Sequence, residues 1–224
     1  MIPTVLYTAD QGSPEFEAGR IVVDVVCAGD SLTGWNNFGP ANSWPYRTYP
    51  DFLQELCVPL ELRIANGGIA GEISDNGPRQ VRNYLSMFPN ARYFVIGMGT
   101  NDLGTWPDTK ATSKRIIANL GKMARAVKDK GKQPILFNVP NANEARFPED
   151  IAEDLREKRD YHNPRLKEFC EQQAIPLADI CSRLTDEHFG DELHPNDAGA
   201  KMIGETVFTV LSASNSGGRP SRAE

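Results

Sequence analysis

The chain has 224 residues, and its 24 Lys and Arg residues against 30 Asp and Glu residues give a formal net charge of −6. The cations are dispersed along the sequence, so no basic stripe predicts a nucleic-acid partner. No apolar run approaches the roughly 18 to 20 residues of a membrane-spanning helix. We therefore expect one α/β domain with its own core, and neither a nucleic-acid-binding nor an integral membrane protein.

Residues 1–20 precede the first strong strand pattern. An apolar stretch at 5–7 is followed by a turn-rich segment at 11–14, which predicts an extended N-terminal arm or short hairpin. The stretch lacks a basic leader and is interrupted by proline and acidic residues, so no secretory signal is visible. We expect a cytoplasmic protein, or a secreted one whose signal has been removed.

The domain itself is expected over residues 21–211. Its first strand is the β-branched run at 21–28, which ends abruptly at Gly29-Asp30-Ser31-Leu32. Such a strand delivers Ser31 at its carboxyl end, where open α/β sheets place their chemistry. A polar loop follows, and Ser43 with Pro45 predicts the start of a helix that runs to about Cys57.

Strands and helices then alternate along the chain. Further strands are predicted at 60–65, 92–97, 135–137 and 176–180, and helices at 75–87, 109–130, 149–173 and from Asn196 or Asp197 to 211. Pro164 predicts a break within the helix at 149–173. Residues 212–224 lack an apolar face and predict a flexible C-terminal tail. The alternation predicts a parallel sheet in a three-layer α/β/α sandwich.

Polar blocks follow the strands at several points. They read Gly29-Asp30-Ser31-Leu32-Thr33, Asn66-Gly67-Gly68-Ile69-Ala70-Gly71, Gly99-Thr100-Asn101-Asp102 and Asp191-Glu192-Leu193-His194-Pro195-Asn196. One such tetrapeptide would be weak evidence, but four blocks in this order resemble the four blocks of the SGNH (GDSL) hydrolase family. The resemblance implies a flavodoxin-like, five-stranded parallel sheet in the order 2-1-3-4-5, and hydrolysis of carboxylic esters without a cofactor.

Ser31 is the candidate nucleophile. A phosphate-binding loop is the competing interpretation, but no Gly-x-Gly-x-x-Gly and no Walker lysine follow the first strand. Asp191 lies three residues before His194, a spacing that can bring a carboxylate beside the imidazole ring. The resemblance assigns these two residues as the acid and base of a triad, whereas a capping aspartate beside an exposed histidine is the alternative.

The oxyanion donors implied by the resemblance are the backbone N–H groups of Ser31 and Gly68 and the side-chain amide of Asn101. From the residues alone, Gly68 also fits a tight turn and Asn101 an Asx turn. Asp30 and Asp102 are expected to bond loop backbone, with a shared divalent metal as the less favoured alternative. No role is predicted for His162 or His188.

The four cysteines show no metal-ligand spacing, so we expect no metal site. Buried free thiols are the favoured interpretation, with a Cys170–Cys181 disulfide as the alternative. Aromatic residues follow the nucleophile and the asparagine, and they would stack on a sugar, wall an acyl slot or simply pack; they are Trp35, Phe38, Trp44 and Trp106.

No apolar lid is visible in the sequence, which favours small, soluble esters, including acetylated sugars. The alternatives are a lysophospholipase or thioesterase, an acyltransferase that passes the acyl group to an alcohol, and a non-catalytic carbohydrate-binding module. A small-molecule ester is the only partner that the sequence predicts.

Overall fold

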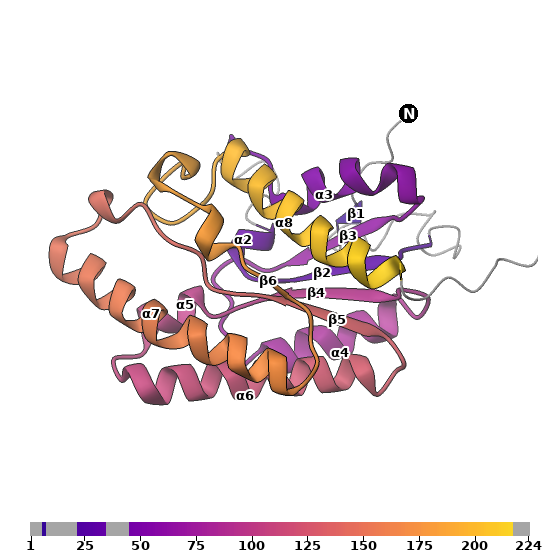
Figure 1. Cartoon of the computed structure of the whole chain (residues 1–224), viewed down its shortest axis with the longest axis horizontal. Coiled ribbons are helices and arrows are strands. Elements are labelled where there is room, and N and C mark those ends of the chain that lie inside the picture. Colours follow the sequence, from indigo (N-terminus) through magenta and orange to yellow (C-terminus); the bar gives the residue numbers. More distant parts are fainter. Residues whose placement is uncertain (1–5, 8–21, 35–44, 217–224) are drawn as a thin grey trace, which may run out of the picture.

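The computed structural model describes residues 6–7, 22–34 and 45–216, and its centre is one parallel sheet (Figure 1). The strand order is β1-β3-β2-β4-β5-β6. These strands are Leu6–Tyr7, Ile64–Gly68, Val25–Gly29, Tyr93–Gly97, Gln133–Phe137 and Leu177–Ala178. The predicted five strands in the order 2-1-3-4-5 are confirmed. Two residues of the predicted arm add β1 as a sixth strand at the edge.

Helices cover both faces of the sheet. Helices α3 (Tyr49–Cys57) and α8 (Asp197–Ser216) lie on one face, and α4 (Gly77–Met87), α6 (Thr109–Lys128) and α7 (Glu149–Gln172) lie on the other (Figure 1). Two short helices, α2 (Ser31–Gly34) and α5 (Thr100–Thr105), follow β2 and β4. Alternate residues of β2 enter separate apolar clusters, because successive strand side chains point to opposite faces. The three-layer α/β/α fold is confirmed.

Strand β3, predicted at 60–65, begins and ends later than predicted. It contains Asn66, Gly67 and Gly68, which the sequence pattern places in a loop. The register explains the difference, because Cys27 pairs with Asn66 and Gly29 pairs with Gly68 along the β2–β3 ladder. Pairing with a buried neighbour here outweighs the weak strand propensity of asparagine and glycine. The predicted start of this strand at residue 60 was wrong, since Val58–Leu60 forms a short 3₁₀ helix.

The first long helix begins at Tyr49 and not at the predicted Ser43 or Pro45; residue 43 lies outside the described residues. A capping box between Thr48 and Asp51 fixes the start, and Thr48 N–H donates to Asp51 Oδ2 at 3.1 Å. Pro50 occupies the first turn, where its missing N–H leaves no helical bond unmade. A local capping box therefore sets this boundary.

The predicted break at Pro164 does not occur, because α7 continues through it. Side chains on either side of the proline supply bonds to the backbone. Arg165 Nη1 donates to the carbonyl oxygen of Tyr161 at 2.7 Å. Asn163 Nδ2 donates to the carbonyl oxygen of Val139 at 2.8 Å, and Val139 N–H donates to Asn163 Oδ1 at 3.1 Å.

Helix α8 extends beyond residue 211, the expected end of the domain, to Ser216. Tyr93 on β4 donates to Asn215 Oδ1 at 2.9 Å and so ties this last turn to the sheet. Residues 212–216 of the predicted flexible tail are therefore helical, and residues 217–224 lie outside the described residues. None of the described helices is long and apolar enough to cross a membrane.

All four cysteines are free thiols, so the alternative Cys170–Cys181 disulfide was wrong. Cys27, Cys57 and Cys170 are buried, and burial raises the pKa of each to about 12. They pack as small apolar side chains.

Candidate active site

Ser31 lies where the sequence predicts, immediately after β2 and at the first residue of α2. The turn is tight: a Cβ on Gly29 would lie 2.3 Å from Thr33 Oγ1 and 2.6 Å from the Gly97 carbonyl oxygen. Only glycine therefore lets α2 fold back over the strand end. Ser31 is 3 % exposed, so its hydroxyl is held among packed neighbours.

His194 and Asp191 approach Ser31 from a loop before α8. His194 Nε2 lies 3.1 Å from Ser31 Oγ, and His194 Nδ1 lies 2.8 Å from Asp191 Oδ2. The two ring nitrogens thus face a hydroxyl on one side and a carboxylate on the other. This continuous chain of hydrogen-bond distances is the geometry that base-assisted activation of a serine requires.

The Asp191 carboxylate is bound by its own turn of chain. Its Oδ1 accepts the backbone N–H of Leu193 at 2.8 Å and that of His194. Partial burial would raise the pKa of Asp191, but these N–H donors and the imidazole outweigh it and leave that pKa below its ordinary value. The carboxylate is therefore charged at neutral pH.

Asp30 and Asp102 bond loop backbone, as one of the two sequence interpretations expects. Asp30 Oδ1 accepts the N–H of Leu32 at 3.0 Å, and Asp102 accepts both the N–H and the hydroxyl of Ser74 at 2.9 and 2.6 Å. Burial raises the pKa of Asp30 to about 7, with a smaller contribution from the Asp102 carboxylate. Within the described residues, no group of three or more His, Cys, Asp or Glu is arranged to hold a metal ion.

Two of the three predicted oxyanion donors have partners of their own. Gly68 N–H donates to Asn66 Oδ1 at 3.0 Å, so this donor reaches a substrate only by sharing or exchanging that bond. A Cβ on Gly68 would lie 2.2 Å from the backbone nitrogen of Gly34, which explains glycine here by close packing of α2 against β3. Asn101 Nδ2 donates one hydrogen to the Glu72 carbonyl oxygen at 2.8 Å and retains a second hydrogen.

A cavity of about 340 Å³ opens beside Asn101. It also reaches Leu193, the residue before His194. Most of its wall is apolar, formed by Leu103, Val139, Pro140, Phe147, Ile151, Leu155 and Leu193, and Asp154 and Arg159 add polar groups. Trp106 does not line this cavity but stacks with Arg115, whose guanidinium carbon lies 4.3 Å from the ring centroid. Trp35, Phe38 and Trp44 lie outside the described residues.

Asn66 is a site residue for which the sequence analysis proposed no role. It is fully buried, and its Nδ2 donates to the Thr33 carbonyl oxygen at 2.9 Å and to Thr48 Oγ1 at 3.2 Å. It therefore links the end of β3 to α2 and to the start of α3. Its position as the first residue of the polar block at 66–71 was the sequence signal that could have indicated a role at the site.

The loop that carries His194 is also held by contacts that no motif indicates. Asn143 N–H donates to the Glu192 carbonyl oxygen at 2.9 Å, and Arg146 Nη1 donates to that of Gly190 at 2.8 Å. His162 and His188 lie outside the array; His162 pairs with Ser113 and His188 with Thr185.

A parallel α/β/α sheet with serine, histidine and aspartate aligned at its carboxyl edge is an arrangement typical of serine hydrolases. The sequence model of the GDSL-like Lipase/Acylhydrolase family matches residues 27–202. The chain belongs to this family, and it is an esterase or acylhydrolase of the GDSL type.

Among curated relatives, an arylesterase of Vibrio mimicus is 26 % identical over 186 residues, which are 82 % of this chain and 85 % of the relative. A shorter match, 33 % identical over 103 residues, involves lysine-specific histone demethylase 1 of Schizosaccharomyces pombe; it spans 43 % of this chain and only 10 % of the demethylase.

Solved structures share the fold. A GDSL-like lipase from Bacteroides thetaiotaomicron has a TM-score of 0.68 at 21 % identity, covering 92 % of this chain and 98 % of the other. A carbohydrate acetylesterase family member from Sinorhizobium meliloti has a TM-score of 0.67 at 18 % identity, covering 86 % and 98 %.

Proposed function

We propose that the chain hydrolyses small, short-acyl carboxylic esters, including acetylated sugars, through an acyl-enzyme on Ser31. The observation that carries the proposal is the unbroken line from Ser31 Oγ through the imidazole of His194 to Asp191, with distances of 3.1 and 2.8 Å. The arylesterase relative and the carbohydrate acetylesterase neighbour support small esters as the substrate class.

In the proposed mechanism, His194 Nε2 accepts the Ser31 proton as Oγ attacks the acyl carbon. The charge that develops on the carbonyl oxygen is met by the Ser31 N–H and by the second hydrogen of the Asn101 amide, with Gly68 N–H as a third donor. Collapse of the tetrahedral intermediate expels the alcohol, which takes the proton from His194. Water then attacks the acyl-enzyme with the same base and releases the acid.

A lysophospholipase or thioesterase is the second candidate, and the largely apolar cavity beside Asn101 is the observation in its favour. A longer acyl chain would lie along Leu103, Val139 and Leu155. Acyl transfer to an alcohol would use the same acyl-enzyme.

The first test replaces the nucleophile. Ser31→Ala should lower the turnover of p-nitrophenyl acetate by several orders of magnitude, because a covalent nucleophile has no local substitute. Ser86→Ala is the matched control, since Ser86 lies on α4, where its hydroxyl donates to the carbonyl oxygen of Arg82 one turn earlier. Activity above roughly a tenth of wild type in Ser31→Ala would exclude Ser31 as nucleophile.

The second test compares the kcat/KM of the wild-type enzyme for p-nitrophenyl esters from acetate to palmitate and for acetylated sugars. The proposal is supported if kcat/KM is highest for p-nitrophenyl acetate and if acetate is released from the acetylated sugars. A maximum at long chains supports the second candidate, ester formation with an added alcohol supports acyl transfer, and sugar binding without turnover supports a binding module.

A further inference from the structure

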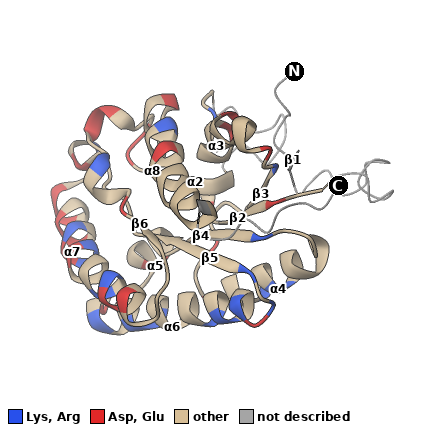
Figure 2. Cartoon of the chain, turned by 45° about the vertical axis from the view of Figure 1, so that its right-hand side comes forward, with Lys and Arg blue, Asp and Glu red and all other residues tan. Residues whose placement is uncertain are grey.

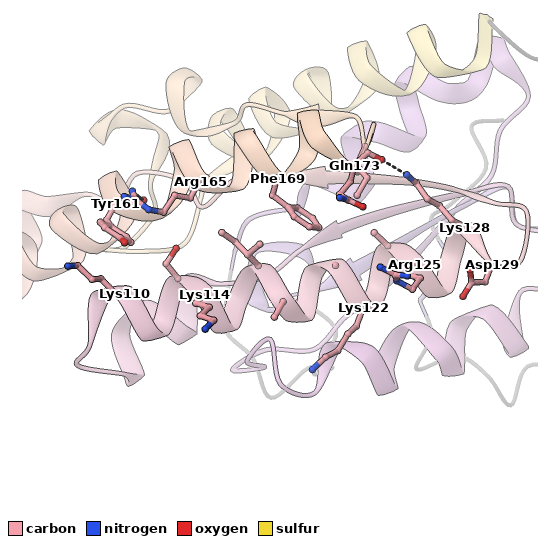
Figure 3. A pocket seen from close by; sticks show the side chains of 16 residues that line it. Lys110, Lys114, Lys122, Arg125, Lys128, Asp129, Tyr161, Arg165, Phe169 and Gln173 are labelled. Carbon is pink, nitrogen blue, oxygen red and sulfur yellow. Dashed lines mark hydrogen bonds between the residues drawn. The ribbon is translucent and has the colours of Figure 1, made fainter.

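A groove of about 900 Å³ runs between α6 and α7, away from the candidate active site (Figure 3). The two helices run in the same direction along it. Tyr161 lies beside the beginning of α6, and Lys128 near its end donates to the Gln173 carbonyl oxygen at 2.6 Å. None of the residues that line the groove belongs to the serine, histidine and aspartate array.

The groove is cationic although the chain as a whole has a net charge of −6. Helix α6 carries six Lys and Arg residues and no acidic residue, and Figure 2 shows these cations along its length. Six cations line the groove, namely Lys110, Lys114, Lys122, Arg125, Lys128 and Arg165, against the single acid Asp129. Cations that are spread from 110 to 165 in sequence are thus gathered by the fold onto one surface.

None of these six cations forms an ion pair with an acidic residue of the described chain, and three of them have no side-chain partner at all. Lys110, Lys114 and Arg125 are exposed, and none of their side chains makes an ion pair or hydrogen bond with the described part of the chain. By contrast, Arg115 on the same helix binds Asp75 at 3.4 Å and stacks on Trp106. The chain therefore neutralises the α6 cation outside the groove and leaves three of those inside it without a side-chain partner.

The charge along the groove is arranged in two groups with an apolar centre. Lys110, Lys114 and Arg165 lie at one end and Arg125 and Lys128 at the other, with Phe169 between them (Figure 3). The sixth cation, Lys122, extends from α6 between the two groups and away from α7, and it donates to Asn119 Oδ1 at 3.0 Å. The central wall is completed by Ile117, Ala118 and Gly121. Arg125 follows Lys114 by eleven positions on α6, which is about three turns or 16 Å.

We propose that this groove binds an amphipathic helix of a partner protein whose acidic residues lie about three turns apart and flank an apolar face. The length from Lys110 to Lys128 is about 27 Å, enough for a docked helix of about 18 residues. The small, exposed side chain of Ala118 lets a third helix approach α6 closely, whereas Gly121 makes room for the Phe169 ring. Carboxylates of the partner then pair with the available cations at both ends.

A bilayer fits this surface less well. The large apolar side chains that are exposed in the described chain are Val22, Val58, Ile69 and Ile151, and all lie outside the groove. The apolar centre is only partly exposed and lies between helices that carry the cations, so a flat membrane would meet charge without insertion.

The test uses a synthetic helical peptide of about 18 residues with two glutamates eleven positions apart and leucine and alanine on the face between them. Fluorescence anisotropy should show salt-sensitive binding to the wild-type chain. Lys114→Glu with Arg125→Glu should weaken binding by roughly tenfold or more. The matched control, Arg82→Glu with Lys201→Glu, makes the same charge change on α4 and α8 and should keep the affinity within about twofold.

Ala118→Arg separates docking from simple charge attraction. It adds a cation but fills the apolar centre, so the proposal expects weaker peptide binding. Tighter binding by this variant would overturn the proposal, as would an equal loss in the control pair or no binding by the wild type. Binding of phosphatidylserine–phosphatidylcholine vesicles in place of the peptide would identify a membrane surface instead. Circular dichroism confirms folding, and Lys114→Gln with Arg125→Gln substitutes if charge reversal unfolds the chain.

Discussion

Asp191 makes two kinds of contact with the residue that it orients. One carboxylate oxygen accepts backbone N–H groups of Leu193 and His194, and the other faces the imidazole at 2.8 Å. The backbone bonds fix the carboxylate, and the carboxylate in turn fixes the ring with a proton on Nδ1. Nε2 is then left as the acceptor that faces Ser31, which is the tautomer that the proposed mechanism needs.

Asp191→Asn should therefore lower kcat/KM by roughly 10³- to 10⁴-fold with little change in fold. The amide can keep the backbone bonds through its oxygen, but its NH₂ then faces Nδ1 and moves the ring proton to Nε2. The wild type should lose activity on the acid side, because only neutral imidazole accepts the Ser31 proton.

The measurement is a pH profile of kcat/KM, with Glu192→Gln as control because it removes a neighbouring, exposed carboxylate. An Asp191→Asn profile that coincides with wild type would show that another group orients His194.

At the scale of elements, the polar blocks were predictable because each is a short local sequence pattern. Boundaries set by distant partners were not. Pairing with β2 draws Asn66 and Gly68 into β3, and the bonds of Asn163 and Arg165 accompany an unbroken helix through Pro164. The Asn143 and Arg146 contacts that hold the His194 loop join segments more than forty residues apart and have no sequence signature.

Asn163→Ala tests the tie between α7 and the end of β5. The substitution removes the side-chain amide that bonds both the N–H and the carbonyl oxygen of Val139. Val139 is only 6 % exposed. Unfolding should become easier by about 1 to 3 kcal/mol, because a buried N–H and C=O lose their bonds. Urea unfolding measures the change, and Gln172→Ala on the exposed side of α7 is the control. A loss no larger than in the control would show that water replaces the amide and that the tie does not stabilise the fold.

At the scale of the whole molecule, two buried titratable groups have strongly shifted pKa values, one between two helices and one at the edge of the sheet. His162 lies between α6 and α7 with Nδ1 3.1 Å from Ser113 Oγ, and burial lowers its pKa from 6.5 to about 4. Asp30 lies beneath α2 at the sheet edge, and burial raises its pKa from 3.8 to about 7. The two groups affect the pH dependence of stability in opposite directions over nearly the same interval.

The signs follow from proton binding. Between about pH 4 and 6.5 the unfolded chain binds a proton at His162 that the folded chain does not, so this group lowers stability as pH falls. Between about pH 4 and 7 the folded chain keeps a proton on Asp30 that the unfolded chain releases, so this group lowers stability as pH rises. Each contributes about 2 kcal/mol between pH 5 and 7, and in the wild type the two largely cancel.

Single substitutions should reveal the separate contributions of His162 and Asp30 to the pH dependence of stability. His162→Gln leaves Asp30 unopposed, so the free energy of unfolding at pH 7 minus that at pH 5 should become more negative than in the wild type by about 2 kcal/mol. Asp30→Asn leaves His162 unopposed, and the same difference should become more positive by a similar amount. Urea unfolding at the two pH values gives this difference directly, and any uniform loss of stability from disturbing a buried position drops out of it. Equal differences in wild type and both variants would show that neither group titrates as its burial requires.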